Sequence, residues 1–171
     1  MAGITYENTR YRTKGELPAV GSRAPDIKLV NSRLQDVSLA NWMGMRKIMN
    51  IVVSIDLSVC AKSVTEFERH GAAYDDLAML TVSHDLPFAH ARFQSEHGLE
   101  KVIALSAIRH AGFGKNYGVQ IMDGPLAGMF ARAVVVIDEN NTVVHIEQLD
   151  DITTEPDYAA AFRALGIDID G

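Results

Sequence analysis

Cys60 is the only cysteine in the chain and the residue best suited to nucleophilic chemistry. It follows residues 47–55, a segment rich in isoleucine and valine that predicts a buried strand. It also lies in the first turn of an amphipathic segment that begins at Val59, with Ser58 or Asp56 as the expected N-cap. Unpaired N–H groups and the helix dipole at such a position favour the thiolate, but free cysteine is also often buried and inert. Position alone therefore leaves a reactive and a structural cysteine equally open.

Arg132 is the one charged residue within residues 130–137, the most strongly apolar strand that the sequence predicts. Charged side chains are rarely buried without a partner, so this arginine faces either solvent or an anionic site. Solvent is the default expectation. A cation close to Cys60 would instead favour the reactive interpretation of the cysteine.

The elements that would position these two residues alternate between strands and helices. A hairpin turn is expected at Asn140–Asn141, and the last helix is expected to begin near Thr154 and its acidic neighbours. This order predicts a central mixed sheet with helices on both faces, in a single domain of residues 1–171. The expected strands are residues 4–6 and 11–13 (a small hairpin), 27–30, 47–55, 77–82, 102–105, 130–137 and 143–149, and the expected helices are residues 59 onward, 87–97, 109–117 and 156–165.

Composition narrows the class of protein. With 171 residues, 47% of them hydrophobic, and a net charge of −6, the chain suits one globular domain and is not a disordered protein. The acidic balance argues against a nucleic-acid partner, and no segment reaches the roughly 18 apolar residues of a membrane span. A single cysteine excludes an internal disulfide and a thiolate zinc cluster. We therefore expect a soluble, cytoplasmic protein with no cofactor and no membrane partner.

The histidines form a weaker candidate site. A metal ion needs three or four converging ligands, and the sequence has no closely spaced histidine pair. His84 follows a predicted strand, and His90 and His97 are seven residues apart on one expected helix. We expect the histidines to be surface or capping residues and expect no metal ion. The six are His70, His84, His90, His97, His110 and His145.

Four blocks of the sequence are similar to the thiol peroxidases, a branch of the peroxiredoxins. The N-terminal hairpin and residues 18–26, PAVGSRAPD, fit the same family, so the resemblance covers essentially the whole chain. It implies an α/β, thioredoxin-like fold of the peroxiredoxin type with an added N-terminal β-hairpin, and it implies a homodimer. The blocks are residues 50–64 (NIVVSIDLSVCAKSV), 83–93 (SHDLPFAHARF), 123–143 (DGPLAGMFARAVVVIDENNTV) and 151–158 (DITTEPDY).

The resemblance also assigns roles to individual residues. The family's peroxidatic cysteine corresponds to Cys60, and its active-site arginine corresponds to Arg132. In the family's loop pattern, Pro-x-x-x-Thr-x-x-Cys, Val53 stands at the proline position and Leu57 at the threonine position. The family's resolving cysteine falls on Gln94. The nucleophile and its arginine are therefore kept, whereas the partner for an internal disulfide is missing from the sequence.

Each departure from the family has a chemical consequence. The family's threonine hydroxyl binds the peroxide, so Leu57 removes a hydrogen bond whose loss slows oxidation about 10- to 100-fold. Ser58 offers a hydroxyl, but it points about 100° away from position 57 on a helical turn. Val53 leaves a backbone N–H that proline lacks. With Gln94 at the resolving position, a sulfenic acid at Cys60 needs an external thiol, such as thioredoxin, glutaredoxin or a glutathione-like molecule, or the cysteine of a second chain.

Three functions are compatible with these residues. The first is a one-cysteine thiol peroxidase that reduces hydrogen peroxide or organic hydroperoxides, with Cys60 and Arg132 as catalytic residues. Its substrate pocket would be lined by Val53, Leu57 and Ser58. The second is a degenerate peroxiredoxin with little turnover that acts as a redox sensor or binding subunit. The third is another thioredoxin-fold thiol enzyme, such as a glutathione-dependent transferase, although the lack of a Cys-x-x-Cys motif disfavours disulfide exchange.

Overall fold

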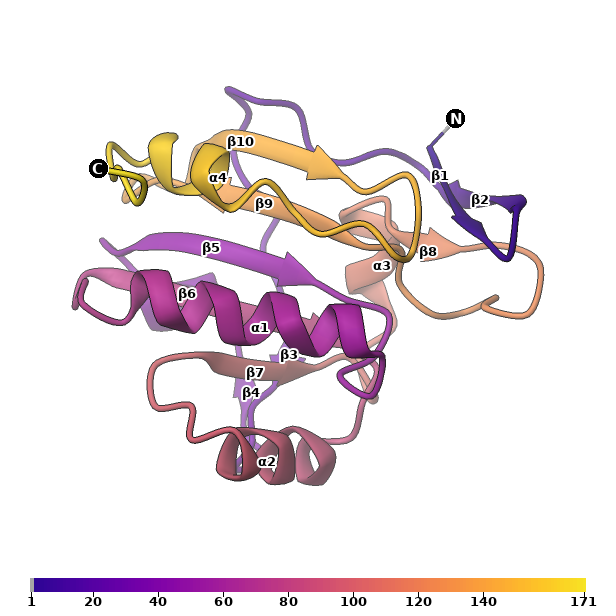
Figure 1. The fold of residues 1–171 in the computed structure, drawn as a ribbon, viewed down its shortest axis with the longest axis horizontal. Coiled ribbons are helices and arrows are strands. Elements are labelled where there is room, and N and C mark those ends of the chain that lie inside the picture. Colours follow the sequence, from indigo (N-terminus) through magenta and orange to yellow (C-terminus); the bar gives the residue numbers. More distant parts are fainter. Residues whose placement is uncertain (1) are drawn as a thin grey trace.

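A central mixed sheet organises the fold. The structure is a computed structural model that describes residues 2–171. In this part of the chain the sheet contains β3 (Leu29–Val30), β4 (Asp36–Val37), β5 (Arg46–Ile51), β6 (Leu77–Ser83), β7 (Ile103–Ser106), β9 (Ala133–Ile137) and β10 (Val143–Gln148). The spatial order is β10–β9–β5–β6–β7–β3–β4 (Figure 1). β5, β6 and β7 are parallel neighbours, whereas β9 pairs antiparallel with both β5 and β10, which confirms the predicted mixed sheet.

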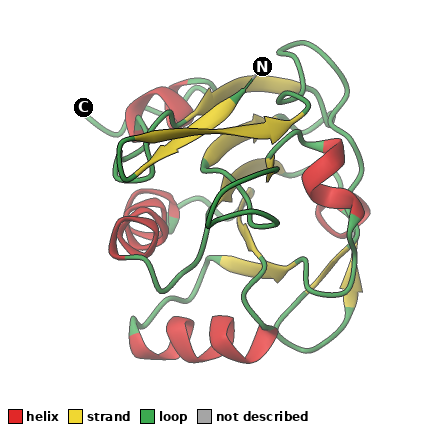
Figure 2. Ribbon diagram, turned by 90° about the vertical axis from the view of Figure 1, so that its right-hand side faces the viewer, coloured by secondary structure: helices red, strands yellow, loops and turns green. Residues whose placement is uncertain are grey.

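Helices cover both faces of this sheet, as predicted (Figure 2). The helices are α1 (Ser58–Gly71), α2 (Pro87–Glu96) and α4 (Tyr158–Arg163) on one face, and α3 (Gly112–Asn116) and the 3₁₀ helix η1 (Leu39–Trp42) on the other. Successive side chains of a strand point to opposite faces. In β5, Ile48 packs in the cluster that contains core residues of α1, α2 and α4, and Met49 packs in the cluster of α3 and η1.

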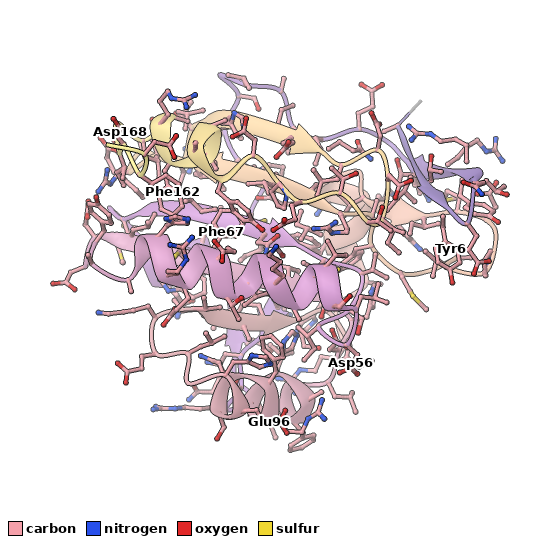
Figure 3. The ribbon with its side chains drawn as sticks, viewed as in Figure 1. Tyr6, Asp56, Phe67, Glu96, Phe162 and Asp168 are labelled. Carbon is pink, nitrogen blue, oxygen red and sulfur yellow. The ribbon has the colours of Figure 1, made fainter. Side chains whose placement is uncertain are left out.

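Aromatic side chains join α1 to α4. Phe67 meets Tyr158 edge-on, with ring centroids 5.1 Å apart. The ring centroids of Phe67 and Phe162, both labelled in Figure 3, lie 6.0 Å apart. Such aromatic pairs stabilise packing beyond the area that they bury. The contacts anchor α1, the helix whose first turn carries Cys60.

The predicted N-terminal hairpin is confirmed. It consists of β1 (Gly3–Tyr6) and β2 (Thr9–Lys14), and β2 also pairs with β8 (Gln120–Ile121) in a second, smaller sheet. The turn residues Glu7 and Asn8 both have positive φ angles, 48° and 65°, as a tight two-residue turn requires. Thr5 of this hairpin exchanges backbone hydrogen bonds with Asp150 (2.7 Å) and Ile152 (3.0 Å). The hairpin therefore holds the segment that follows β10.

Several boundaries differ from the prediction. β5 ends at Ile51 rather than at residue 55, because the chain turns at residues 54–57, where Leu57 N–H donates to Ser54 O (3.1 Å). The last helix begins at Tyr158, since the Asp157 carboxylate accepts the Ala160 N–H (3.0 Å) as its N-cap. β4, β8 and η1 were not predicted, because two to four residues are too few to produce a periodic pattern. Among the described residues, no helix is long and apolar enough to cross a membrane.

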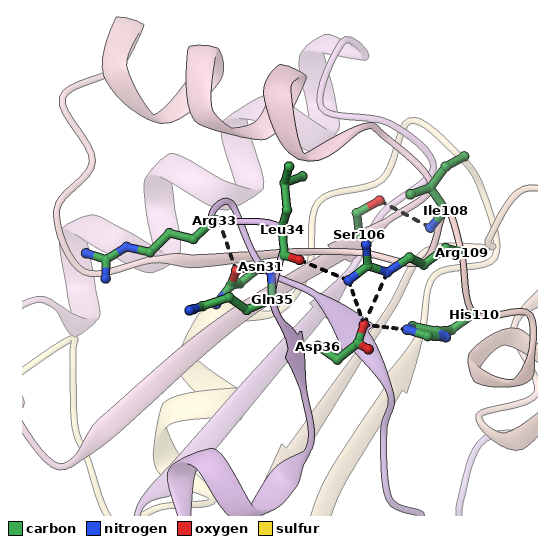
Figure 4. A network of polar contacts seen from close by, with 9 residues as sticks. All are labelled: Asn31, Arg33, Leu34, Gln35, Asp36, Ser106, Ile108, Arg109 and His110. Atoms are coloured by element: carbon green, nitrogen blue, oxygen red, sulfur yellow. Dashed lines mark hydrogen bonds and ion pairs between the residues drawn. The ribbon is translucent and has the colours of Figure 1, made fainter.

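A surface network connects β4 to the segment before α3 (Figure 4). Arg109 Nη2 donates to Asp36 Oδ1 at 2.9 Å and to Leu34 O at 2.9 Å, and His110 Nε2 lies 2.6 Å from the same carboxylate oxygen. Hydrogen bonds from His110 and then Arg109 lower the pKa of Asp36. His110 therefore has a structural partner at the surface, as the sequence predicts.

Candidate active site

Cys60 is the third residue of α1 and has no exposed surface. The first hydrogen bond of the helix runs from Ala61 N–H to Leu57 O (2.9 Å). The amides of residues 58–60 therefore have no partner within the helix. A negative charge placed at this end of α1 is stabilised by the helix dipole. The position suits a thiolate, although the sulfur is closed off from solvent.

The predicted N-cap of α1 is wrong. Leu57 occupies the N-cap position and makes no side-chain capping bond, and Ser58 is already the first helical residue. The Asp56 carboxylate pairs with Arg92 of α2 at 3.3 Å. The cap could not be read from residue preference, because the turn before α1 is fixed by tertiary contacts rather than by a local capping bond.

Arg132 lies immediately before β9 and, like Cys60, has no exposed surface. Its Nη1 donates to the carbonyl oxygens of Ile152 (3.0 Å) and Thr154. Among the residues that the structure describes, its Nε and Nη2 have no hydrogen-bond partner. The default expectation of a solvent-facing arginine is therefore wrong. One side of the guanidinium is fixed by the protein, and the other N–H groups are available to an anion or a ligand.

The charges around Arg132 connect it to Cys60. Burial lowers the pKa of Arg132, because desolvation penalises the cation. A negative charge on Cys60 opposes this change, and it raises the pKa of Arg132 more than the charges of Tyr158, Glu155 or Glu147 do. The geometry agrees, because Ala131, the neighbour of Arg132, lies in the apolar cluster that contains Cys60. Ile152, whose carbonyl oxygen accepts from Arg132, lies in the same cluster. The fold therefore places Cys60 and Arg132 in the same buried region, and their catalytic roles stay a prediction.

The three predicted pocket residues lie in two places. Val53 is buried in the apolar cluster that contains Cys60 and Ile152, so it covers the site from within the core. Leu57 and Ser58 line a surface hollow of about 350 Å³. Leu57 also packs against the cluster that contains Cys60. A mostly apolar hollow therefore lies directly outside the buried cysteine, and its other lining residues are Tyr6, Val59, Ile152 and Thr153.

Gln94 has a structural contact in place of a redox role. It lies on α2, and its Nε2 donates to Val102 O at 2.7 Å. This bond connects α2 to the segment just before β7. The side chain at the family's resolving position is therefore engaged in packing and offers no thiol to Cys60.

The carboxylate of Asp85 holds the turn before α1 and was not among the predicted site residues. Asp85 follows β6, its Oδ1 accepts from the Ser54 hydroxyl (2.9 Å) and its Oδ2 accepts from Ile55 N–H (2.9 Å). Ser54 Oγ in turn accepts from Asp56 N–H (3.1 Å). A partial signal was present, because Asp85 follows the predicted strand of residues 77–82, Ser54 lies near the end of the predicted strand of residues 47–55, and the ends of neighbouring parallel strands meet at one edge of a sheet.

His90 also corrects a prediction. Its side chain is buried on α2, with 1% of its surface exposed, whereas we expected a surface or capping histidine. Burial lowers the pKa of His90, and the charge of Asp85 opposes that shift. His84 is half-buried and its ring lies 4.1 Å from that of Phe130. His97 is exposed, as predicted.

Comparisons with known proteins agree with this architecture. A family model described as redoxin matches residues 19–162. A thiol peroxidase of Mycobacterium bovis is 45% identical over 166 residues, which cover 97% of this chain and 99% of the relative. A thiol peroxidase of Corynebacterium glutamicum is 41% identical over 165 residues, which cover 96% of this chain and 99% of the relative.

Solved structures have the same fold. A peroxiredoxin-like protein from Aquifex aeolicus superposes with a TM-score of 0.89 and 29% identity, covering 96% of both chains. A thiol peroxidase from Chromobacterium violaceum also gives a TM-score of 0.89, with 26% identity, over 96% of this chain and 95% of its own. These matches confirm the thioredoxin-like α/β fold of the peroxiredoxin type. The chain belongs to the redoxin family, and within it to the thiol peroxidases.

Proposed function

We propose that the protein reduces hydroperoxides by a one-cysteine mechanism in which Cys60 is the nucleophile. The observation that supports this most directly is the burial of Cys60 together with Arg132, whose Nε and Nη2 have no partner in residues 2–171. A cation in a site of low dielectric stabilises the thiolate, which is the nucleophilic form of cysteine. The free N–H groups of Arg132 are oriented donors for the peroxide oxygens, on which negative charge develops during the reaction.

The proposed reaction uses one sulfur atom. The thiolate of Cys60 attacks the terminal oxygen of the hydroperoxide and the O–O bond breaks. The alkoxide leaves and takes up a proton as an alcohol, and Cys60 becomes a sulfenic acid. An external thiol then condenses with the sulfenic acid and releases water, which forms a mixed disulfide. A second external thiol attacks that disulfide, so the two external thiols leave as their own disulfide and the cysteine returns to its reduced form.

The hollow outside Cys60 favours organic hydroperoxides over hydrogen peroxide. Tyr6, Leu57, Val59 and Ile152 give it an apolar lining suited to a hydrocarbon group. An alkyl chain in the hollow would direct its peroxide end toward the cysteine cluster, against which Leu57 and Val59 pack. Hydrogen peroxide gains nothing from such a surface, because it has no apolar part to bury.

The reductant must come from outside the chain. Cys60 is the only cysteine, and Gln94 stands where a resolving cysteine would be. We infer that a small or protein thiol, of the thioredoxin, glutaredoxin or glutathione type, reduces the sulfenic acid. Because Cys60 has no exposed surface, the residues that cover it, including Leu57, must move before a thiol reaches the sulfur.

A redox sensor is the second candidate function, and Leu57 favours it. The leucine removes a hydroxyl that would hold the peroxide, and it covers a fully buried thiol. Both features slow oxidation, and a slowly oxidised cysteine signals only sustained exposure to peroxide. A sensor would form the same sulfenic acid but would change its assembly or partner rather than turn over.

Rapid mixing with a peroxide separates these functions. We expect cumene hydroperoxide to oxidise Cys60 at least about 100-fold faster than it oxidises free cysteine at the same pH, as oriented cationic donors allow. Hydrogen peroxide should react more slowly than cumene hydroperoxide. Cys60→Ser is the control and should consume no peroxide. Oxidation no faster than that of free cysteine would overturn the peroxidase. Slow oxidation to a sulfenic acid that changes the assembly of the protein, without turnover in any added thiol, would support the sensor.

A further inference from the structure

Ser83, Asp85 and His90 form a chain of hydrogen bonds between α2 and the end of β6. Ser83 Oγ donates to Asp85 Oδ2 at 2.6 Å and accepts from Asp85 N–H at 3.0 Å. His90 Nε2 lies 3.1 Å from the same hydroxyl oxygen. Ser83 is 0% exposed and His90 1% exposed, so water does not compete for these bonds.

Counting protons fixes the direction of the bond from His90. A serine hydroxyl has one hydrogen to donate and two lone pairs that accept. The hydrogen of Ser83 is committed to the Asp85 carboxylate, because a carboxylate oxygen at 2.6 Å accepts only. His90 must therefore donate from Nε2 to Ser83. In the neutral ring, which burial favours by lowering the pKa of His90, the proton is therefore on Nε2 and Nδ1 carries a lone pair.

That lone pair is unsatisfied. In the described part of the chain, His90 Nδ1 has no hydrogen-bond partner although the side chain is buried. A buried acceptor without a partner costs stability, and a leucine of similar size would avoid this cost. The imidazole is therefore poorly explained by packing, and its one polar contact, with Ser83, is the feature that distinguishes it from a hydrocarbon.

The other end of the chain of bonds reaches the turn before Cys60. Asp85 uses Oδ1 for the Ser54 hydroxyl and Oδ2 for both Ile55 N–H and the Ser83 hydroxyl. The turn of residues 54–57 leads directly into α1 and sets where its first residues begin. An Asp85 carboxylate that rotated would release the Ile55 amide and loosen the start of the helix.

We propose that His90 is a positioning residue for Cys60: by donating to Ser83, it keeps that hydroxyl on Asp85 and thereby holds the Asp85 carboxylate against the turn of residues 54–57. The inference deepens the proposed function and rests on it, because it gives the turn a role in presenting the nucleophile. His90 touches neither the sulfur nor the peroxide, and it acts through two intervening side chains.

Three variants test this relay. His90→Leu keeps the size of the side chain and removes the donor, whereas His90→Gln keeps an N–H donor near the position of Nε2. His97→Leu is the matched control, because it makes the same change at an exposed histidine just after the same helix. The readouts are hydrogen exchange of the Ile55 amide, the rate of Cys60 oxidation by cumene hydroperoxide, and the free energy of unfolding in urea.

The relay predicts a local effect. In His90→Leu, the Ile55 amide should exchange about tenfold faster, the ratio that corresponds to one net hydrogen bond, and Cys60 should be oxidised several-fold more slowly. Amides of β9 should keep their protection. His90→Gln should restore both values to within about twofold of wild type, and His97→Leu should change neither. Rescue by glutamine distinguishes positioning from packing, since leucine fills the space equally well.

Several results would overturn the inference. Unchanged Ile55 exchange in His90→Leu would do so, and so would a glutamine variant that behaves like the leucine variant. If His90→Leu does not fold, Ser83→Ala breaks the same relay at the next residue and must give the same faster exchange. The exchange measurement needs no peroxide. Slow oxidation of the wild type would therefore end the proposed function, while Ile55 exchange would still decide the relay.

Discussion

Arg132 is a buried cation that lacks a full set of partners. Nη1 is held by two carbonyl oxygens, while Nε and Nη2 have none among the described residues. A buried charge that is incompletely paired destabilises a fold. Groups that are retained at such a cost are concentrated at functional sites. At the scale of single residues, a negatively charged sulfur at Cys60 would give the unpaired side of Arg132 a partner, and Arg132 would in turn stabilise that charge.

Replacing Arg132 should therefore separate activity from stability. Arg132→Met keeps much of the side-chain volume and removes the buried charge, but it also removes the donor to the carbonyl oxygens of Ile152 and Thr154. Because these effects oppose each other, the free energy of unfolding should change by no more than about 1 kcal/mol. Oxidation of Cys60 should slow about 100-fold or more, because the oriented donors are lost. Urea unfolding and rapid-mix oxidation of the same preparation provide the check. A variant that unfolds easily yet reacts at the wild-type rate would show that Arg132 is a structural residue.

Leu57 is the residue whose reversal should raise activity. Leu57→Thr restores a hydroxyl at the position that resembles the family's threonine, and it enlarges the hollow outside Cys60. We expect oxidation of Cys60 by cumene hydroperoxide to speed up about 10- to 100-fold, as one charge-assisted hydrogen bond allows. Ser58→Thr is the control, since it adds a methyl group to a hydroxyl that is already present. Equal rates in Leu57→Thr and wild type would mean that position 57 does not contact the peroxide.

At the scale of elements, the turn before α1 shows where sequence reasoning ends. The periodic patterns of α1 and β6 were sufficient to predict both elements. Ile55 is buried and apolar, so the sequence extends β5 through it, although β5 ends at Ile51. The chain turns at residues 54–57 instead, and that turn is held by the bond from Ile55 N–H to Asp85, a residue 30 positions away. No local pattern contains that partner, and for the same reason the burial of His90 was not predicted.

Because His90 is buried, the free energy of unfolding should depend on pH through this residue of α2. Burial lowers the pKa of His90 below its ordinary value of 6.5. The unfolded chain therefore binds a proton at a higher pH than the folded chain does. The stability that comes from keeping His90 neutral is fully present above about pH 6.5. As the pH falls from there toward the pKa of His90 in the folded state, the free energy of unfolding decreases by at most about 1.4 kcal/mol per pH unit.

Urea unfolding of wild type and His90→Gln between pH 7.5 and 5 would measure this contribution. The wild type should lose more stability than the glutamine variant as the solution is acidified. The comparison isolates His90 from His84, whose pKa is also lowered by burial and which both proteins contain. Parallel stability curves would contradict a neutral, buried His90.

At the scale of the whole molecule, the site depends on segments distant in sequence. The carbonyls that hold Arg132 belong to residues 20 and 22 positions later, and the N-terminal hairpin fixes that segment through Thr5. Composition and periodicity predicted the sheet and its helices. They did not predict that these distant segments meet at Arg132, so the default expectation was that Arg132 faces solvent. The family resemblance assigned Arg132 and Cys60 to one site. It could do so because the family's sequence pattern includes residues that are distant in the chain, whereas periodicity reports only local structure.

The homodimer implied by the resemblance stays a prediction. Leu86 and Phe88 at the start of α2 are 50% and 68% exposed, and Ile108, which follows β7, is 50% exposed. Large apolar side chains on a surface are suited to contact with another chain. Light scattering should give about twice the 18.7 kDa of one chain, and Phe88→Glu should give the monomer. A monomeric wild type would exclude the dimer without affecting the chemistry proposed for Cys60.

The chemical state of Cys60 after a brief pulse of cumene hydroperoxide tests the central claim most directly. Mass spectrometry of the intact protein should show a gain of one oxygen atom at Cys60 when no thiol is present. It should show a mixed disulfide, followed by return to the reduced mass, when glutathione or reduced thioredoxin is added. Cys60→Ser should show neither change. A cysteine that keeps its reduced mass through the pulse would contradict the account.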